Sequence, residues 1–277
     1  MIFESEIFNL NFENDVCYLG FKTFDFLPFI THGLSTKFGG VSNGQYKSMN
    51  LGFSGGDDKN NVFKNYEIFC KAIGIDSHSI VASAQDHNTY IRTVTKSDKG
   101  IGIYREKDLT SVDGLITNQA GVSLAIYFAD CVPVLFVDPV KKVIAAAHAG
   151  WRGTVGLIAE KMVLKMLQQY GCNPEDILVG IGPSIGQCCY EVDKEVADKF
   201  EKSNAFDCDE IIRSVGNGKF MVNLQQANIQ LLLKRGIRPE NIACTDICTK
   251  CYKDLLFSHR ATKGKRGVMA AVIQIKE

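Results

Sequence analysis

Apolar residues recur at the three- and four-residue spacing of a helix in two clear segments of the chain. Residues 62–73 carry such a face and are followed by Gly74, and residues 154–170 carry another and are closed by Gly171 and Pro174. Glycine and proline are common just past the end of a helix because neither continues it well. We therefore predict helices over 62–73 and 154–170.

Two more helices are expected in the second half of the chain. One lies near residues 191–203. The other opens at Asn223, whose side chain can cap it with Gln226 three positions on, and it ends before Gly236 and Pro239.

Apolar runs of a different kind predict the strands. Residues 127–153 read as two hydrophobic strands, 176–186 as a strand running into a Gly/Pro turn, and 266–276 as a last strand. Residues 79–94 read as a strand, a polar break and a second strand. Helices and strands thus alternate, with several hairpin-like pairs. This order predicts an α/β fold in which mixed β-sheets are covered by helices.

The segment 31–58 has no such pattern. It holds seven glycines among Ser and Asn, which predicts a loop or short hairpin whose backbone can approach a ligand, and hence a candidate lid. No fixed-period repeat, low-complexity tract or Pro/Ser-rich linker interrupts the chain. We therefore expect one domain over residues 1–277.

Charge and cysteine content narrow the classes of function. The 31 basic and 31 acidic residues cancel, so the overall field predicts neither nucleic acid nor an anionic membrane as partner. The N-terminus is acidic where a secretory signal would be basic, and no apolar run is long enough to span a membrane. We expect a cytoplasmic protein, in which the ten cysteines are buried, catalytic or metal-bound rather than paired in disulfides.

Three side chains at the ends of apolar β segments are candidates for chemistry: His87, Cys131 and His148. Two imidazoles and one thiolate suit a borderline-soft cation, and three protein ligands leave a fourth tetrahedral position for a reactant. Alternatively, Cys131 is a small core residue and His148 a hydrogen-bonded interior imidazole. The separations of 44 and 17 residues match no short zinc-finger signature.

A second group of cysteines lies in "CTDICTKC", which places Cys244, Cys248 and Cys251 in a C-x3-C-x2-C pattern ahead of His259. Three interpretations stay open. The residues bind an iron–sulfur cluster, they form a closed structural zinc site, or the thiols cluster by chance.

Basic residues in turn or Gly-rich segments are candidates for binding an anion: Lys37, Arg152, Arg260 and Lys263. Arg152 stands out because it follows "HAGW" and precedes a predicted helix, whose N-terminal amides favour an anion. Most such side chains are simply solvated.

Six motifs in one order resemble the laccase-domain family of YfiH type, described both as polyphenol oxidases and as purine nucleoside phosphorylases. They are "STKFGGVSNGQYKSMNLG", "SAQDHN", "VDGLITNQAGVSLAIYFADCVPVLFVDP", "AAHAGWRGT", "GIGPSIGQCCYEV" and "FSHRATKGKRGVMAAV". The resemblance implies a four-layer α/β/β/α sandwich related to toxin cysteine deamidases. It also implies one zinc ion bound by His87, Cys131 and His148. Of the second cysteine group, only Cys248 fits the family pattern.

The chain departs from the family at Lys37, where arginine is usual, at Asp86 and Asn88 beside His87, and at His259. Lysine keeps the charge at position 37 but loses the bidentate fork of arginine. None of these changes removes a metal ligand.

The activity that the resemblance implies is zinc-dependent phosphorolysis of a purine nucleoside, such as adenosine, inosine or methylthioadenosine, with adenosine deamination as a second activity. Lys37, Arg152 and Arg260 are then expected to bind substrate or phosphate, and Cys131, His148 and Asp113 to be catalytic, with Asp113 carrying a proton. The protein would act on small molecules as a monomer or homodimer.

Three alternatives remain open from the residues. Copper suits the same ligands and would give a polyphenol oxidase, although multicopper oxidases need more imidazoles than the five available. Without metal, Cys131 and His148 would form a nucleophile and base for an amide hydrolase that edits peptidoglycan precursors. A zinc closed by a fourth protein ligand would instead stabilise a binding module.

Overall fold

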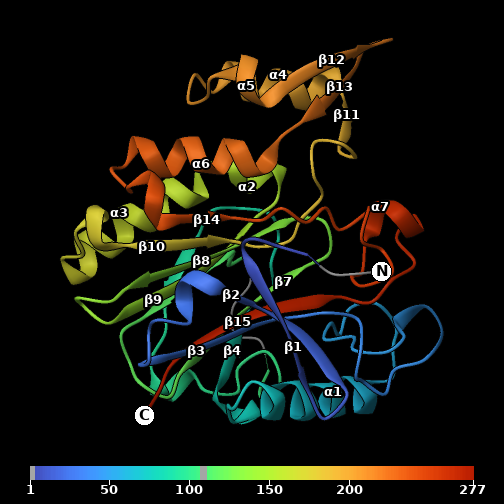
Figure 1. Ribbon diagram of the computed structural model, residues 1–277, viewed down its shortest axis with the longest axis vertical. Helices are drawn as coiled ribbons and strands as arrows, with labels where there is room; N and C mark the ends of the chain where they lie inside the picture. Colours follow the sequence, from blue (N-terminus) through green and yellow to red (C-terminus); the bar gives the residue numbers. More distant parts are fainter. Residues whose placement is uncertain (1–3, 107–110) are drawn as a thin grey trace.

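Two six-stranded sheets form the centre of the molecule in the computed structural model, which describes residues 4–106 and 111–277 (Figure 1). The first sheet has the order β1-β2-β3-β15-β7-β4. Its strands are β1 (Phe8–Glu13), β2 (Val16–Phe21), β3 (Ile30–Ser35), β4 (Ile80–Ala82), β7 (Ser123–Phe128) and β15 (Met269–Ile275).

The second sheet has the order β14-β10-β8-β9-β6-β5. Its strands are β5 (Ile91–Thr93), β6 (Gly114–Thr117), β8 (Val132–Asp138), β9 (Val143–Ala149), β10 (Leu178–Ile181) and β14 (Ile242–Cys244). A third, small sheet contains β11 (Glu191–Asp193), β12 (Ile212–Gly216) and β13 (Lys219–Val222). Antiparallel and parallel pairs occur in both large sheets, so they are mixed, as predicted.

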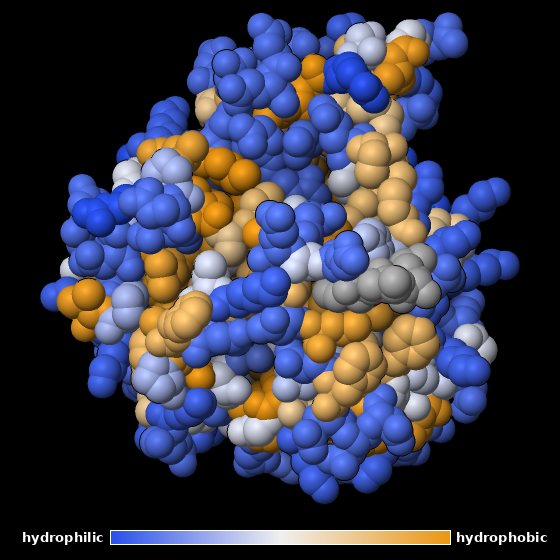
Figure 2. Space-filling model, viewed as in Figure 1, coloured by the Kyte–Doolittle hydropathy of each residue, from blue (hydrophilic) through white to orange (hydrophobic). Residues whose placement is uncertain are grey.

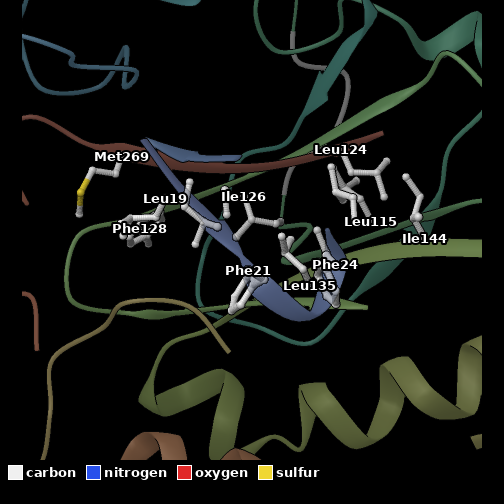
Figure 3. Close-up of a cluster of buried hydrophobic side chains, with 14 of the residues drawn as sticks. Leu19, Phe21, Phe24, Leu115, Leu124, Ile126, Phe128, Leu135, Ile144 and Met269 are labelled. Atoms are coloured by element: carbon white, nitrogen blue, oxygen red, sulfur yellow. The ribbon is translucent and has the colours of Figure 1, made fainter. Parts of the chain in front are cut away.

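Helices cover the outer faces of the stacked sheets. Helix α1 (Lys59–Ala72) packs on the first sheet, and α3 (Ile158–Tyr170) and α6 (Leu224–Lys234) pack on the second (Figure 1). One apolar cluster fills the space between the sheets, where side chains from both meet (Figure 3). Two further clusters lie under the helices. The predicted four-layer α/β/β/α arrangement is confirmed.

The central strands are apolar without alternation because both of their faces are buried. In β15, Ala271 and Ile273 face the layer between the sheets, while Ala270 and Val272 face α1. Strands β8 and β9 are also buried on both faces: alternate side chains point into the layer between the sheets, and the others pack against α3. A continuous apolar run is the pattern expected of a strand covered on both sides.

Two of the predicted helices form as expected. The first is α1, where the Asp58 side chain accepts a hydrogen bond from the amide of Asn60. The second is α6, where the Asn223 side chain accepts one from the amide of Gln226. Each cap satisfies a backbone donor that the first helical turn leaves without a partner.

The helix predicted over 154–170 is wrong in one respect, since the structure has two helices there. Helix α2 (Trp151–Val155) ends at Gly156, and α3 begins after Leu157, whose φ of 66° is left-handed. A left-handed residue cannot continue a right-handed helix. The periodic apolar face did not reveal this break.

Two other boundaries also differ from the prediction. Residues 191–193 form β11, and the helix expected there is α4 (Lys194–Lys202), beside the short α5 (Cys208–Ile211). The predicted loop over 31–58 contains most of β3, which lies inside the first sheet: Leu34 pairs with both β2 and β15, and Gly33 pairs with β15. Most of the remainder of that segment is irregular.

The face of the molecule shown in Figure 2 mixes polar residues with scattered apolar patches. None of the ten cysteines is in a disulfide. Among the described residues, no helix is long and apolar enough to cross a membrane.

The layer between the sheets should dominate stability. Leu124 is fully buried there, so Leu124→Ala should lower the free energy of unfolding by about 2–5 kcal/mol through lost burial and a residual cavity. Leu167 in α3 is 45% exposed and supplies a control with the same chemical change. Denaturant unfolding of both variants measures the difference. Equal destabilisation by the two substitutions would contradict this account of the core.

Candidate metal centre

His87, Cys131 and His148 come together from three separate segments. His87 lies in the connection from β4 to β5, Cys131 in the turn from β7 to β8, and His148 near the end of β9. Their ligand atoms all lie within 4.8 Å of one another, and Cys131 Sγ is 3.8 Å from His87 Nε2. The structure therefore brings together the three residues that the sequence predicted as candidate ligands.

The β8–β9 hairpin explains the 17-residue separation of two of these ligands. Val132 pairs with Ala149 and Pro133 with His148, so Cys131 lies opposite the residues that follow the strand. Gly150 occupies that place, where a Cβ would lie 2.9 Å from His87 Cδ2 and 3.0 Å from Cys131 Sγ. Glycine at this position leaves the ligands room to converge.

The Asp113 carboxylate holds the first histidine loop in place. It is fully buried just before β6, and it accepts hydrogen bonds from the backbone amides of Asp86 (3.1 Å), His87 (3.0 Å) and Asn88 (3.0 Å). His87 has a left-handed φ of 64°, a conformation that is uncommon outside glycine. The three amide donors stabilise this loop conformation.

The same carboxylate orients His148. Asp113 Oδ1 lies 2.7 Å from His148 Nδ1, and the His148 amide donates to the Asp113 carbonyl at 2.8 Å. With Nδ1 bound to the carboxylate, Nε2 is the nitrogen left for an ion. A carboxylate behind a ligating imidazole is the usual outer shell of a metal site.

Mutual interactions make Cys131 and His148 an ion pair when no metal is bound. Burial alone would raise the pKa of Cys131, but the charge and hydrogen bonds of His148 and His87 lower that pKa to about 6. Burial alone would lower the pKa of His148, but Cys131 and Asp113 raise it to about 9. Burial also opposes ionisation of Asp113, yet its hydrogen bond to His148 keeps its pKa below the usual value. The thiol is thus a thiolate near neutral pH.

A cavity of about 380 Å³ opens beside the three ligands. Its size lies in the usual range for small-molecule sites. Its wall includes the three candidate ligands His87, Cys131 and His148. It also includes three aromatic residues, Phe53, Tyr127 and Phe128, and one arginine, Arg266. A second cavity of about 430 Å³ shares Arg266 and is lined by the basic residues Lys37, Lys47, Lys253 and Lys265.

Arg266 is a site residue that the sequence reasoning missed. It is half-buried, and its Nε is a buried donor without a hydrogen-bond partner among the described residues. Such an unpaired donor is uncommon in proteins. Its place in the Gly-rich segment "GKRG" resembles that of several other basic residues, so only the cavity distinguishes it.

The other predicted basic residues lie around this centre in different places. Lys37 lines the second cavity, where its Nζ donates to the Lys253 carbonyl at 2.7 Å. Arg260 lies over the Tyr190 ring, and Arg152 lies over the Trp151 ring. Burial and the negative charge of Cys131 raise the pKa of Tyr190, while the positive charges of Arg260 and Arg152 oppose this rise, so all three charges lie within electrostatic reach of the Tyr190 hydroxyl.

Asp130, next to Cys131, links the centre to the C-terminal segment. Its φ is 91°, and its carboxylate accepts hydrogen bonds from Thr249 Oγ1 and from the Arg260 amide, each at 2.6 Å. These contacts stabilise a backbone conformation that is costly for a non-glycine residue.

The second cysteine group differs from the prediction. Cys248 and Cys251 lie with Cys188 and Cys189, whereas Cys244 and His259 are not part of that group. The reason is that the chain turns after Cys244, at the end of β14, and the next residues approach the loop after β10.

A family model described as "Multi-copper polyphenol oxidoreductase laccase" matches residues 31–276. The chain belongs to this laccase family. The resemblance drawn from the motifs is confirmed.

Relatives of this laccase-family chain are named after different activities. It is 40% identical over 246 residues to "Purine nucleoside phosphorylase YlmD" of Geobacillus stearothermophilus, covering 88% of this chain and 90% of that protein. It is 33% identical over 216 residues to "Adenosine deaminase RL5" of an unknown prokaryotic organism, covering 78% and 82%. The crystal structure of the hypothetical protein YfiH of Bacillus licheniformis is 36% identical with a TM-score of 0.92, covering 98% of this chain and 100% of that one.

Metal binding by this laccase-family chain should depend steeply on pH. Between the pKa of Cys131 near 6 and that of His148 near 9, the metal-free pair holds one proton, which an ion must displace from His148. The apparent association constant should therefore rise about tenfold per pH unit in this window. Calorimetric titration of metal-free protein in buffers of different protonation enthalpy counts the released protons. Binding without proton release would contradict the ion-pair assignment.

The role of Asp113 can be tested by Asp113→Asn, which removes the charge behind His148. We expect metal affinity to fall about 10–100-fold, because the outer carboxylate raises ligand basicity and fixes the ring. Asp138→Asn is a matched control, since Asp138 is equally buried but accepts the amides of Val140 and Lys141 at the far end of β8. Unchanged affinity in the Asp113 variant would exclude this role.

Proposed function

We propose that the chain is a zinc-dependent purine nucleoside phosphorylase, acting on adenosine, inosine or methylthioadenosine, with adenosine deaminase activity at the same site. The observation that carries the proposal is the convergence of two imidazoles and a thiolate on the wall of a nucleoside-sized cavity that is also lined by the half-buried Arg266. The names of the relatives supply the substrate class.

The donor set fits zinc. His87, Cys131 and His148 are three ligands of the types that zinc prefers, and an ion with three protein ligands keeps a position for a reactant. A closed site would need a fourth side chain, and no other metal-binding side chain of the described residues joins this group. Only two of the five histidines are in it, which favours one ion over several coppers. When bound, zinc would supply a Lewis acid beside the cavity.

The cavity wall suits a purine nucleoside. Phe53, Tyr127 and Phe128 provide aromatic surface for a base, and the amide of Gln85 already bonds the backbone of Tyr127, which holds this wall in place. Apolar and aromatic surface with few polar groups is typical of small-molecule sites.

Arg266 is the residue that we assign to phosphate. Arg266 lines both the cavity of the candidate metal ligands and the lysine-lined cavity, so an anion bound by its guanidinium would also lie near the lysines of the second cavity, Lys37 among them. Arg152 and Arg260 add positive charge on the Tyr190 side of Cys131. A guanidinium can bind phosphate through two parallel hydrogen bonds.

In this proposal Asp113 acts through His148. It accepts four hydrogen bonds and is fully buried, so we assign it to holding the proton on His148 Nδ1. That contact keeps Nε2 directed at the reaction centre.

A second candidate function rests on the metal-free ion pair. A Cys131 thiolate next to a protonated His148 is the arrangement of cysteine hydrolases, and it would suit amide hydrolysis of a peptidoglycan precursor. Alkylation of Cys131 in metal-free protein that is blocked by an aminoacyl precursor, but not by inosine, would favour this candidate.

The main test is incubation of the purified protein with adenosine, with and without phosphate, followed by separation of products. Adenine and ribose 1-phosphate formed only with phosphate show phosphorolysis, and inosine shows deamination. Cys131→Ala should abolish both activities together with zinc at this site, whereas Cys208→Ala, a half-buried cysteine in α5, should change neither. Wild-type turnover in the Cys131 variant would end the proposal.

The phosphate assignment has its own test. Arg266→Gln should raise the KM for phosphate about 10–100-fold, because a charge-assisted hydrogen bond contributes about 1.5–3 kcal/mol, and zinc content should stay unchanged. Arg213→Gln, on the exposed strand β12, is the matched control. An unchanged KM for phosphate in the Arg266 variant would remove this residue from the site.

A further inference from the structure

Four cysteines form a second group, separate from the His87, Cys131 and His148 centre. Cys188 and Cys189 lie in the loop between β10 and β11, and Cys248 and Cys251 follow β14. Their sulfur atoms all lie within 4.8 Å of one another. The two pairs are about sixty residues apart in sequence, so the fold brings them together.

The distances fit a single ion. Cys188 Sγ is 3.8 Å and Cys189 Sγ is 3.6 Å from Cys251 Sγ. Zinc–sulfur bonds of about 2.3 Å in a tetrahedron place neighbouring sulfurs about 3.8 Å apart. A disulfide would need about 2.05 Å between sulfurs. An iron–sulfur cluster places several iron and sulfide ions between its thiolates, and four sulfurs this close leave space for one ion.

The backbone around Cys248 supplies an independent sign of a metal ligand. The amide of Gly186 donates a hydrogen bond to Cys248 Sγ at 3.2 Å. A backbone N–H directed at a sulfur stabilises its thiolate and is typical of the surroundings of cysteine metal ligands. Gly186 lies in the loop that also carries Cys188 and Cys189, so this contact reaches Cys248 from the other pair of cysteines.

Gly186 also shapes the group. A Cβ at this position would lie 3.2 Å from Cys248 Cβ and 3.3 Å from Cys188 Sγ, so a larger residue would crowd the sulfurs. The two segments are joined further by a bridge of Ser184 with Cys248 and by the Thr249 amide, which donates to the Ser184 carbonyl at 3.0 Å. The sulfurs are therefore held together by backbone contacts from both loops.

We propose that Cys188, Cys189, Cys248 and Cys251 bind a structural zinc ion. Soft thiolates select zinc, and four protein ligands close its coordination so that the ion has no catalytic position. The site contains none of the residues of the first centre and does not depend on the proposed function.

The location gives the ion a positioning role. It joins the loop that leads to Tyr190 and β11 with the segment that runs from β14 toward α7 (His259–Thr262), on the right of Figure 1. Thr249 and Arg260 on that segment both hydrogen-bond Asp130, the neighbour of Cys131. The Arg260 guanidinium lies over Tyr190 and donates to the Glu191 carbonyl. The zinc would hold these two segments at a fixed separation, next to the Asp130 turn that carries Cys131.

The test is a zinc count per chain on full-length protein dialysed in metal-free buffer, by mass spectrometry of the metal. We expect two zinc ions in the wild type, one in Cys131→Ala and one in the double variant Cys188→Ser with Cys251→Ser. Cys244→Ser, a nearby cysteine outside the group, is the matched control and should keep two. One ion in the wild type together with one in the double variant would overturn the proposal.

A spectroscopic measurement keeps the proposal testable if the double variant fails to fold. In Cys131→Ala, which retains all four cysteines of the group, X-ray absorption at the zinc edge should show four sulfur neighbours at about 2.3 Å. Nitrogen or oxygen neighbours in place of sulfur would contradict it, as would an intact mass that shows a disulfide between Cys189 and Cys251. Because neither readout uses turnover, loss of the phosphorylase proposal would leave this one standing.

Discussion

The buried carboxylate of Asp113 is the constraint on which the rest of the site depends. One side chain accepts three amides of the His87 loop and the ring nitrogen of His148. These donors come from the β4–β5 connection and from β9; β4 belongs to the first sheet, whereas β5 and β9 belong to the second, where β6 lies between them. A charged oxygen with this many donors in a dry environment is strongly held, so the positions of two candidate metal ligands are set by a residue outside the candidate ligand group.

The sheets supply the rigidity that this arrangement requires. His148 and Cys131 lie at the end of the β8–β9 hairpin, whose residues are buried on both faces. The strained backbone lies just outside the regular strands, at His87 and Asp130, where φ is left-handed. Such conformations persist only where the surroundings over-determine them. Here each is held by carboxylate contacts, from Asp113 to the His87 loop and from Asp130 to Thr249 and Arg260.

The two sulfur-containing groups differ in a way that matches their proposed roles. The first offers three ligands on the wall of a cavity, with a guanidinium nearby, and suits a reactant. The second offers four thiols at the junction of two loops and suits an ion that only joins them. Coordination number thus separates a reactive centre from a structural one. Of the C-x3-C-x2-C pattern in the sequence, only the C-x2-C part, Cys248 and Cys251, belongs to the second.

Local sequence determined much of the fold and the identity of the ligands. Apolar runs in β8, β9 and β15, and the Asp58 and Asn223 caps, depend on neighbouring residues and on burial, which a sequence expresses directly. The family motifs named His87, Cys131 and His148. The break at Leu157 was not visible, because a left-handed residue leaves the apolar spacing on either side nearly intact.

Only the tertiary structure decided which distant groups meet. It placed Arg266, whose Nε has no partner among the described residues, at the cavity, and it surrounded the Asp113 carboxylate with four hydrogen-bond donors. It also brought Cys188 and Cys189, rather than Cys244 and His259, to Cys248 and Cys251. Each of these depends on how one loop packs against another after the sheets stack. The spacing of residues along the chain does not show which distant residues meet, because such a contact depends on how the segments between them fold.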